Sequence, residues 1–344
     1  MQLTAEESGQ AAIWHHEDED IRLAAVWTEK KKGRGEDAPP TALHQRHSGR
    51  GVLAVYDGVG GAGARPVGRT PDGREVSGAF LASRVAHFAL EDWFFRTDPD
   101  RRVTDPCSLD EALGAAMQQT GVPRNMKISG TMVRHLPTTL AAVEYQVEGY
   151  QLNAVARWAG DSRAYLLNEG EGLQAITRDD TDDSDALVLL INDQPMNNMV
   201  SADRPIQIRS YPLPGIRLPV ILICATDGFF NYVPTPAHFE YLLLATMQSA
   251  SSLRSWAVEL AQRVQGFTSD DASLVAASFG YVTFEAMRQA FRRRQAFLEK
   301  KFVQPIREIN PEHERERFVQ ARESCWAHYK PGYEKFIRAM EDSK

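Results

Sequence analysis

Apolar residues in the first 280 positions of the chain fall into short runs and into longer periodic stretches. The short runs have strand length and are rich in small or β-branched side chains, which predicts β-strands. They cover residues 21–27, 51–56, 139–145, 151–158, 164–167, 220–225 and 272–279. In the longer stretches apolar residues recur every three or four positions, which predicts helices. These stretches cover residues 79–94, 109–119, 237–247 and 252–264.

The order of these elements favours one fold class. Predicted strands come in groups, and predicted helices lie between the groups instead of after every strand. This order is typical of an α+β sandwich and not of a strictly alternating parallel sheet.

The pattern changes at about residue 280. Apolar residues then recur at helical spacing over 284–302 and over 318–340, among many Lys, Arg and Glu residues. We therefore divide the chain into a body, residues 1–280, and a helical extension, residues 281–344. Amphipathic helices usually cover a core, so we expect the extension to pack on the body, and a module that docks a partner is the alternative.

Composition and charge agree with this division. The 344 residues are 43% hydrophobic and 25% charged, which is ordinary for a globular protein and excludes collagen, disorder and a disulfide-rich miniprotein. The extension has 14 basic and 10 acidic residues, a net charge of +4, and the body has 25 and 36, a net charge of −11. An acidic body argues against a broad nucleic-acid surface, so no nucleic-acid partner is expected.

The sequence also carries signals about the compartment. Cys107, Cys224 and Cys325 lie far apart, which suggests neither a disulfide framework nor a zinc site. The first residues lack the basic and apolar regions of a signal peptide, and the longest apolar runs are far shorter than the ~20 residues of a membrane span. We expect a cytoplasmic protein without membrane attachment.

One glycine-rich motif is similar to a dinucleotide-binding fingerprint. Residues 58–63 (GVGGAG) match G-x-G-x-x-G and follow a predicted strand. The fingerprint needs a helix that begins at its third glycine and faces the pyrophosphate, but residues 65–73 intervene before the next helical pattern. Asp57 would also face the phosphates without a counter-ion. A dinucleotide-dependent oxidoreductase remains a distant alternative.

Acidic residues stand at the ends of several predicted strands. They comprise the pairs Glu36-Asp37, Asp57-Gly58, Asp227-Gly228 and Asp270-Asp271, and the single residue Asp161. Asp and Gly are common in turns for backbone reasons alone. Several such positions in one chain, without a His or Cys cluster, favour all-oxygen ligation of Mg²⁺ or Mn²⁺ and a two-metal hydrolytic site.

Six blocks of the sequence, in order, resemble those of the type 2C (PPM) metal-dependent protein serine/threonine phosphatases. The blocks are RGEDA (34–38), VYDGVGG (55–61), PTTL (137–140), GDSRAY (160–165), ATDGFF (225–230) and SDDAS (269–273). The resemblance implies a four-layer αββα sandwich of two antiparallel sheets flanked by helices. It also implies hydrolysis of phosphoserine and phosphothreonine in proteins, in a signalling role that opposes a serine/threonine kinase.

The resemblance assigns roles to the acidic residues. It implies that Asp57 bridges two Mn²⁺ or Mg²⁺ ions, with Glu36 and the Gly58 carbonyl on one ion and Asp227 and Asp270 on the other. Hydroxide between the ions would attack the phosphorus in line, so Asp57, Asp227 and Asp270 are the expected catalytic residues. No side-chain nucleophile is then needed.

The substrate phosphate needs a cation of its own, which in this family is an Arg a few residues before the Glu. Lys32 lies four residues before Glu36 and Arg34 lies two before it, so either residue is a candidate. The acidic run 179–185 lacks the glycine and terminal Glu of an EF-hand, and we expect it to belong to the flap that the family places near its active site.

Three departures from the family pattern matter for function. Val59 stands where many members have a His that is a candidate general acid. Asn231 stands where many have a second Asp, which weakens a third metal site whose remaining ligand would be Asp161. The glycine-rich insertion 62–78 is expected to shape substrate access. The alternative function is therefore a pseudophosphatase or scaffold that recruits a partner through the C-terminal helices.

Overall fold

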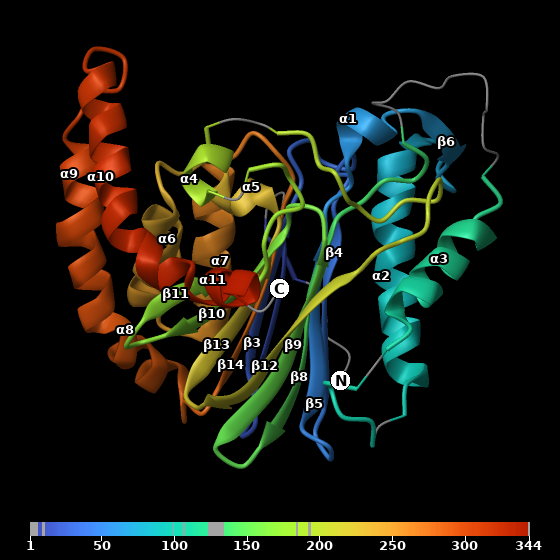
Figure 1. Cartoon of the computed structure of the whole chain (residues 1–344), viewed down its shortest axis with the longest axis horizontal. Coiled ribbons are helices and arrows are strands. Elements are labelled where there is room, and N and C mark those ends of the chain that lie inside the picture. Colours follow the sequence, from blue (N-terminus) through green and yellow to red (C-terminus); the bar gives the residue numbers. More distant parts are fainter. Residues whose placement is uncertain are drawn as a thin grey trace.

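The computed structural model describes residues 6–8, 11–98, 100–105, 107–122, 134–183, 185–191 and 194–342. Two antiparallel β-sheets lie face to face at the centre of the protein, and helices cover both outer faces (Figure 1). This arrangement confirms the αββα sandwich expected from the sequence.

The two main sheets have seven and five strands. In the first, the order is β1 (Glu6–Ser8), β2 (Ala11–Glu17), β3 (Arg22–Thr28), β14 (Ala272–Phe279), β13 (Val220–Ala225), β10 (Arg163–Asn168) and β11 (Gly172–Ala175). In the second it is β12 (Arg209–Arg217), β9 (Gln151–Ala159), β8 (Leu140–Glu148), β5 (Arg50–Tyr56) and β4 (Ala38–Gln45). A small hairpin, β6 (Pro66–Arg69) and β7 (Glu75–Ser77), lies outside both sheets.

Strand β3 illustrates how the layers are built. Leu23 and Ala25 lie in the apolar core between the two sheets. Ala24 and Val26 lie in the core beneath the outer helices. Successive side chains of a strand point to opposite faces, and here both faces are covered, so almost every residue of the strand is apolar.

Four helices form the outer layers of the body. Helices α2 (Gly78–Arg96) and α3 (Leu109–Gln119) pack on the five-stranded sheet, and helices α6 (Pro236–Ser249) and α7 (Leu253–Gln265) pack on the seven-stranded sheet (Figure 1). All four lie where the apolar spacing predicts them. The body also has the one-turn helices α1 (Gly60–Gly63), α4 (Ala186–Leu189) and α5 (Asp227–Phe230).

The C-terminal extension is helical and packs on α6. Its elements are α8 (Phe284–Leu298), a π-helical turn (Glu299–Val303), α9 (Gln304–Arg307), α10 (Arg315–Tyr333) and α11 (Lys335–Asp342). Apolar residues of the extension belong to the same core cluster as those of α6 and α7. Buried Glu240 of α6 accepts a hydrogen bond of 2.6 Å from the Tyr329 hydroxyl and two of 2.8 Å from Arg294. The extension and the body therefore share one core.

The sequence prediction lacks strands β1, β2, β4, β6, β7, β11 and β12. Strands β4 and β12 each contain two prolines, Pro39 and Pro40 in β4 and Pro212 and Pro214 in β12, and each has an irregular register. Proline cannot donate a ladder hydrogen bond and is therefore tolerated at sheet edges and bulges. Both strands are the edges of the five-stranded sheet.

The surroundings of the glycine-rich motif at 58–63 argue against dinucleotide binding. Strand β5 pairs antiparallel with both of its neighbours, whereas the dinucleotide-binding unit is built on parallel strands. Among the described residues, no helix has both the length and the apolar character of a membrane span.

Candidate active site

Two Asp-Gly turns end central strands of the two sheets, and both require glycine. A Cβ at Gly58 would lie 2.5 Å from the Glu36 carbonyl oxygen and 2.9 Å from that of Ala79. A Cβ at Gly228 would collide with the carbonyl oxygen of Asp271. At each glycine two segments of the backbone lie so close together that a side chain would not fit. Glycine therefore lets the Asp57 turn approach Glu36 and the Asp227 turn approach Asp271.

Mutual repulsion and burial raise the pKa values of the carboxylates at this edge. Burial raises the pKa of the Asp57 carboxyl well above its usual value, and the charges of Asp37, Asp227 and Asp161 raise it further. Burial, and then the charge of Asp270, raises the pKa of Asp227 to about 6. These carboxylates come from both sheets, and a bound cation would relieve their repulsion.

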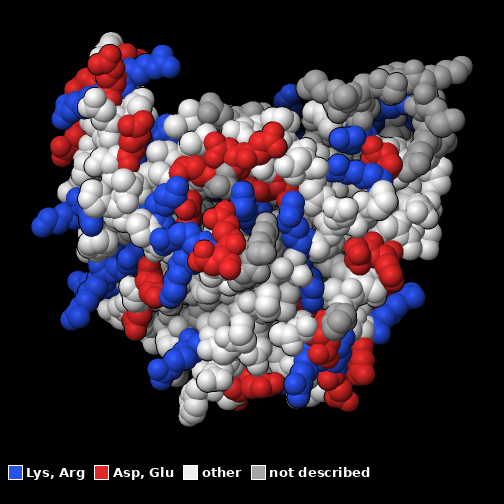
Figure 2. Space-filling model, in the orientation of Figure 1, with Lys and Arg blue, Asp and Glu red and all other residues white. Residues whose placement is uncertain are grey.

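Burial also raises the pKa values of Glu36, Asp161 and Asp270. For Asp161 the next cause is the charge of Asp227, and for Asp270 it is the charge of Asp271, after an opposing backbone hydrogen bond. In the space-filling view, acidic side chains gather over α4 and α5, the region where the Asp227 turn begins (Figure 2). The acidic residues predicted as ligands are thus electrostatically coupled.

Asp37 belongs to this site although the sequence pattern assigns it no role. Its side chain is 2% exposed and accepts hydrogen bonds from the hydroxyls of Thr226 (3.0 Å) and Ser273 (2.9 Å). Burial, and then the charge of Asp271, raises its pKa well above the usual value. Asp37 therefore joins the end of β13, next to Asp227, to the start of β14, which follows Asp270. Its position directly after Glu36 in a family block was the available signal.

Four polar side chains hold Glu36 in place, and three of them, Ser77, Ser83 and Arg84, have no role in the sequence analysis. The Asp271 carboxylate accepts a hydrogen bond of 2.6 Å from the Glu36 backbone N–H. The Ser77 hydroxyl, which also caps α2, donates to the Glu36 carboxylate. Ser83 and Arg84 of α2 donate to the Glu36 carbonyl, at 2.5 and 3.3 Å. Glu36 is therefore oriented by α2 and by the loop before β14.

The donor set fits a hard divalent cation in its chemistry. All the candidate groups are oxygens, and their repulsion raises several pKa values. Across the described residues, no three Asp, Glu, His or Cys side chains already converge as ligands on one point. Asp227 accepts a hydrogen bond of 2.9 Å from the Asn231 amide, and Glu36 accepts one from the Ser77 hydroxyl. A cation would have to replace some of these hydrogen bonds.

Two cavities are lined by some of the predicted residues, while Asp57 and Gly58 line neither of them. The first, of about 430 Å³, is lined by Glu36, Ser77 and Arg34. The second, of about 320 Å³, is lined by Asp161, Asp227, Asp270 and Asn231. Lys32 and Arg34 are both exposed, but Arg34 lines the first cavity together with Glu36, whereas Lys32 lines neither cavity.

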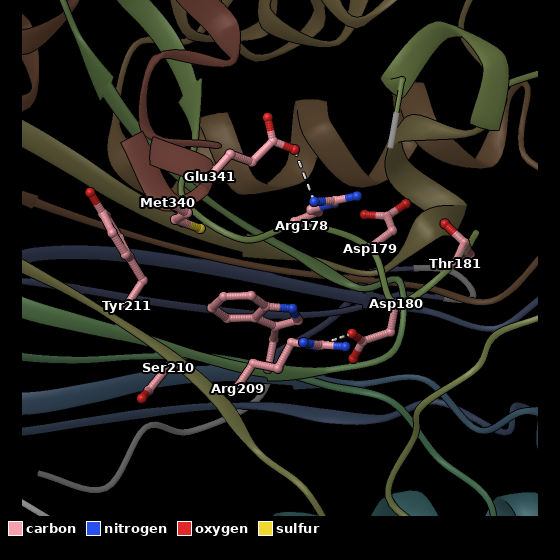
Figure 3. Close-up of a pocket in the computed structure, with 10 residues that line it drawn as sticks. Arg178, Asp179, Asp180, Thr181, Arg209, Ser210, Tyr211, Met340 and Glu341 are labelled. Atoms are coloured by element: carbon pink, nitrogen blue, oxygen red, sulfur yellow. Dashed lines mark hydrogen bonds and ion pairs between the residues drawn. The ribbon is translucent and has the colours of Figure 1, made fainter. Parts of the chain in front are cut away.

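A third cavity, of about 500 Å³, lies beneath the C-terminal helix (Figure 3). Met340 and Glu341 of α11 form part of its wall, and Glu341 pairs with Arg178 at 2.9 Å. Asp179 and Thr181 line both this cavity and the one that contains Asp227. The extension is therefore adjacent to the candidate active site.

Several carboxylates of the acidic run 179–185 are bound by neighbouring groups. Asp179 forms a double contact with Arg163. Asp180 pairs with Arg209, as Figure 3 shows. Asp185 caps α4 through the backbone N–H groups of Leu187 and Val188, while Ser184 lies outside the described residues. The run lies beside the candidate site, and its role as a flap remains a prediction.

Comparison with known proteins identifies the fold. No family model matches the sequence, and no curated protein sequence matches it. The solved structure of the Mycobacterium tuberculosis serine/threonine phosphatase PstP/Ppp is similar, with 19% identity and a TM-score of 0.51 over 76% of this chain and 99% of that chain. The chain has the fold of the type 2C serine/threonine phosphatases.

Other solved phosphatase structures show the same likeness. A bacterial serine phosphatase aligns with 15% identity and a TM-score of 0.50, over 75% of this chain and 97% of that chain. A variant of a bacterial serine phosphatase aligns with 14% identity and a TM-score of 0.52, also over 75% and 97%. The phosphatase fold thus occupies about three quarters of this chain and nearly all of each neighbour.

Proposed function

We propose that this protein is a metal-dependent phosphatase that hydrolyses phosphoserine and phosphothreonine in other proteins. The observation that carries the proposal is the gathering of Glu36, Asp57, Asp227 and Asp270 at one edge of the phosphatase fold, where burial raises the pKa of each carboxyl. Such repulsion costs stability unless the site serves to bind cations.

The proposed ligands divide between two ions. Asp57 would be a ligand of both Mn²⁺ or Mg²⁺ ions, Glu36 and the Gly58 carbonyl would hold one of them, and Asp227 and Asp270 would hold the other. Asp161, whose pKa is raised by burial and by Asp227, remains the proposed ligand of a third, weaker ion. When bound, divalent ions lower the pKa of water enough to make it a nucleophile at neutral pH. The carboxylates would hold the ions in place.

Arg34 is the proposed binding residue for the substrate phosphate. It lines the cavity that contains Glu36 and Ser77, whereas Lys32 does not. A guanidinium can donate two parallel hydrogen bonds to a phosphate, which orients the phosphoryl group as well as neutralising it. Lys32 would then contribute only through its longer-range charge.

The cellular setting extends the same proposal. We infer that the protein acts in the cytoplasm, in signalling, on a protein that a serine/threonine kinase phosphorylates. Residues 1–280 would form the catalytic body, and residues 281–344 would be a basic extension with surface for a docking partner. The contact of Glu341 with Arg178 beside the candidate site supports a link between extension and activity.

A pseudophosphatase or scaffold is the second candidate function, and Asn231 is the observation that favours it. Asn231 donates a hydrogen bond of 2.9 Å to Asp227, so a neutral amide stands where a further carboxylate would strengthen cation binding. Metal binding separates the candidates, because a scaffold has no need for the remaining carboxylates.

Hydrolysis in Mn²⁺ tests the proposal. Purified protein should release phosphate from p-nitrophenyl phosphate and from a phosphothreonine peptide, and excess chelator should stop both reactions. Asp57→Asn should abolish activity while the protein stays folded. Asp92→Asn, which alters an exposed pair on α2, should retain full activity. No hydrolysis of either substrate by the wild-type protein in Mn²⁺ would rule out the enzyme.

A further inference from the structure

The hairpin β6–β7 projects a second arginine into the cavity beside Glu36. Thr70 closes its tip: its N–H donates to the Arg74 carbonyl at 2.8 Å, and its hydroxyl accepts from the Arg74 N–H at 3.2 Å. Gly73 supplies the left-handed backbone, with φ of 86°, that the turn requires. The hairpin lies next to α1 and the start of α2 (Figure 1). Arg74 is therefore held by a fixed turn.

Packing directs the Arg74 guanidinium toward the cavity. Its centre lies 5.4 Å from the centroid of the Phe80 ring, within the range of a cation–π contact. A Cβ on Gly33 would lie 3.5 Å from Arg74 Nη1, so the guanidinium reaches the loop that carries Arg34. Arg74 and Arg34 line the same cavity of about 430 Å³, together with Glu36 and Ser77.

The two arginines of this cavity are not neutralised by ion pairs. Over the residues described in the structure, neither Arg34 nor Arg74 forms a salt bridge with a carboxylate, and the Arg74 Nε is buried without a hydrogen-bond partner. Glu75 also lines the cavity, but its carboxylate is bound by Arg69 at 2.6 Å. A guanidinium that lines the cavity and has no carboxylate partner keeps N–H donors for an acceptor that a substrate would supply.

We propose that Arg74 binds a second anionic group of the substrate, an acidic or phosphorylated residue that flanks the phosphoresidue to be hydrolysed. The inference rests on the proposed function, in which Arg34 takes the scissile phosphoryl group. The cavity is of the size that accommodates a ligand with several functional groups. Two guanidinium groups on different chain segments can each form a bidentate pair with its own carboxylate or phosphate. The preferred substrates are therefore acidic phosphopeptides.

Two fluorescent phosphothreonine peptides test the second subsite, one with glutamates and one with alanines on both sides of the phosphothreonine. Binding is measured by anisotropy in chelator, with the full chain, so the readout does not depend on hydrolysis. The wild-type protein should bind the acidic peptide about tenfold more tightly. Arg74→Gln should abolish this preference, and Arg74→Lys should restore part of it, because Lys keeps the charge without the bidentate geometry.

Matched variants define the controls. Arg96→Gln, which removes an exposed arginine of α2 that does not line this cavity, should leave the preference unchanged. Arg34→Gln should weaken both peptides alike. Equal binding of the two peptides by the wild-type protein would overturn the second subsite, and so would equal weakening of both by Arg74→Gln, because Arg74 would then hold the scissile phosphate.

Kinetics separate this inference from the proposed function. With Mn²⁺, Arg74→Gln should raise KM for the acidic peptide about tenfold, with little change in kcat or in the KM for the alanine peptide. If the wild-type protein hydrolyses neither peptide, the phosphatase proposal fails, while the anisotropy preference still decides whether Arg74 reads acidic flanks. An unchanged KM ratio in the variant would overturn the second subsite in an active enzyme.

Discussion

Arg163 of β10 and Asp179 form a double ion pair, with Nε–Oδ1 and Nη2–Oδ2 distances of 2.8 and 2.7 Å. Both side chains are almost fully buried. The Arg163 guanidinium also lies 4.3 Å from the centroid of the Phe230 ring, in the turn that follows Asp227. This pair connects the cavity under α11 with the cavity that contains Asp227, because Asp179 lines both.

Loss of one partner of this pair should be strongly destabilising. Asp179→Asn leaves a buried, unpaired guanidinium, and we expect the free energy of unfolding to fall by about 3–5 kcal/mol. Arg163→Met combined with Asp179→Asn should cost less than the sum of the two single changes, since neither charge is then stranded. Urea unfolding of the four proteins measures the difference. Strict additivity would show that the pair is not coupled.

Metal binding should change the stability of the wild-type protein and not that of Asp57→Asn. The raised pKa of Asp57 means that its ionised form opposes folding in the absence of metal, so stability is lost as the pH rises above the unfolded value of about 4. At neutral pH without metal, Asp57→Asn should therefore be more stable than the wild-type protein.

Addition of Mn²⁺ should reverse that order. Metal at 100 times its dissociation constant stabilises the wild-type protein by about 2.7 kcal/mol, whereas the variant lacks the bridging ligand. Thermal unfolding with Mn²⁺ and with chelator measures both effects. Equal stabilisation of the two proteins by Mn²⁺ would place the metal elsewhere.

Glycine at position 228 should be irreplaceable. A Cβ there collides with the Asp271 carbonyl, so Gly228→Ala must displace the strand end that carries Asp270 and Asp271. We expect a loss of about 1–3 kcal/mol and a loss of metal affinity. The control is Gly114→Ala in the middle of α3, where nothing lies within 4 Å, and which should stabilise by about 0.5–1 kcal/mol. Chemical unfolding compares them, and a neutral Gly228→Ala would contradict the close approach.

His238 should make the protein less stable in acid. Burial, and then the charge of Arg322, lowers the pKa of His238 to about 4, below the unfolded value of about 6.5. The unfolded chain therefore binds the proton first. Stability is fully present above pH 6.5 and falls, by at most about 1.4 kcal/mol per pH unit, as the pH decreases toward 4.

His238→Gln should remove this part of the pH dependence. His238 lies near the start of α6, where its ring is 2.9 Å from the Thr235 hydroxyl, which in turn contacts Cys325 of α10. Urea unfolding of both proteins at pH 7, 6 and 5 provides the comparison. Parallel pH profiles would show that another group is responsible.

Removal of the extension should destabilise the body. A chain that ends at Gly280 loses buried Phe284, Met287 and Phe291, which belong to the same core cluster as α6. Their loss exposes a large apolar patch, so we expect aggregation or a much lower unfolding temperature. A chain that ends at Glu334 loses only α11 and should remain soluble. A stable, monomeric 1–280 fragment would show that the extension is a separable module.

The sequence by itself determined the fold class, most of the secondary structure and the identities of the candidate ligands. Strands such as β13 and β14 are continuous apolar runs because both of their faces are covered, and helices α2, α3, α6 and α7 have clear periodic spacing. The Asp-Gly pairs were recognisable because a carboxylate and a glycine that the backbone requires stand next to each other in the sequence. Edge strands β4 and β12 escaped because their prolines interrupt the strand pattern.

Only the tertiary structure decided which residues surround those ligands. Ser77 and Arg84 are ordinary polar residues in the sequence, and Asp37 and Asp271 stand out only as members of acidic pairs without an assigned role. The contacts of these residues with the site join segments up to 236 positions apart. Arg74 lies in the insertion 62–78, and the sequence does not reveal that it lines a cavity with Arg34 and Glu36. Local pattern encodes which face of an element is buried, but it does not encode which distant element covers that face. The arrangement of carboxylates and arginines around the candidate site is therefore a property of the packed sheets.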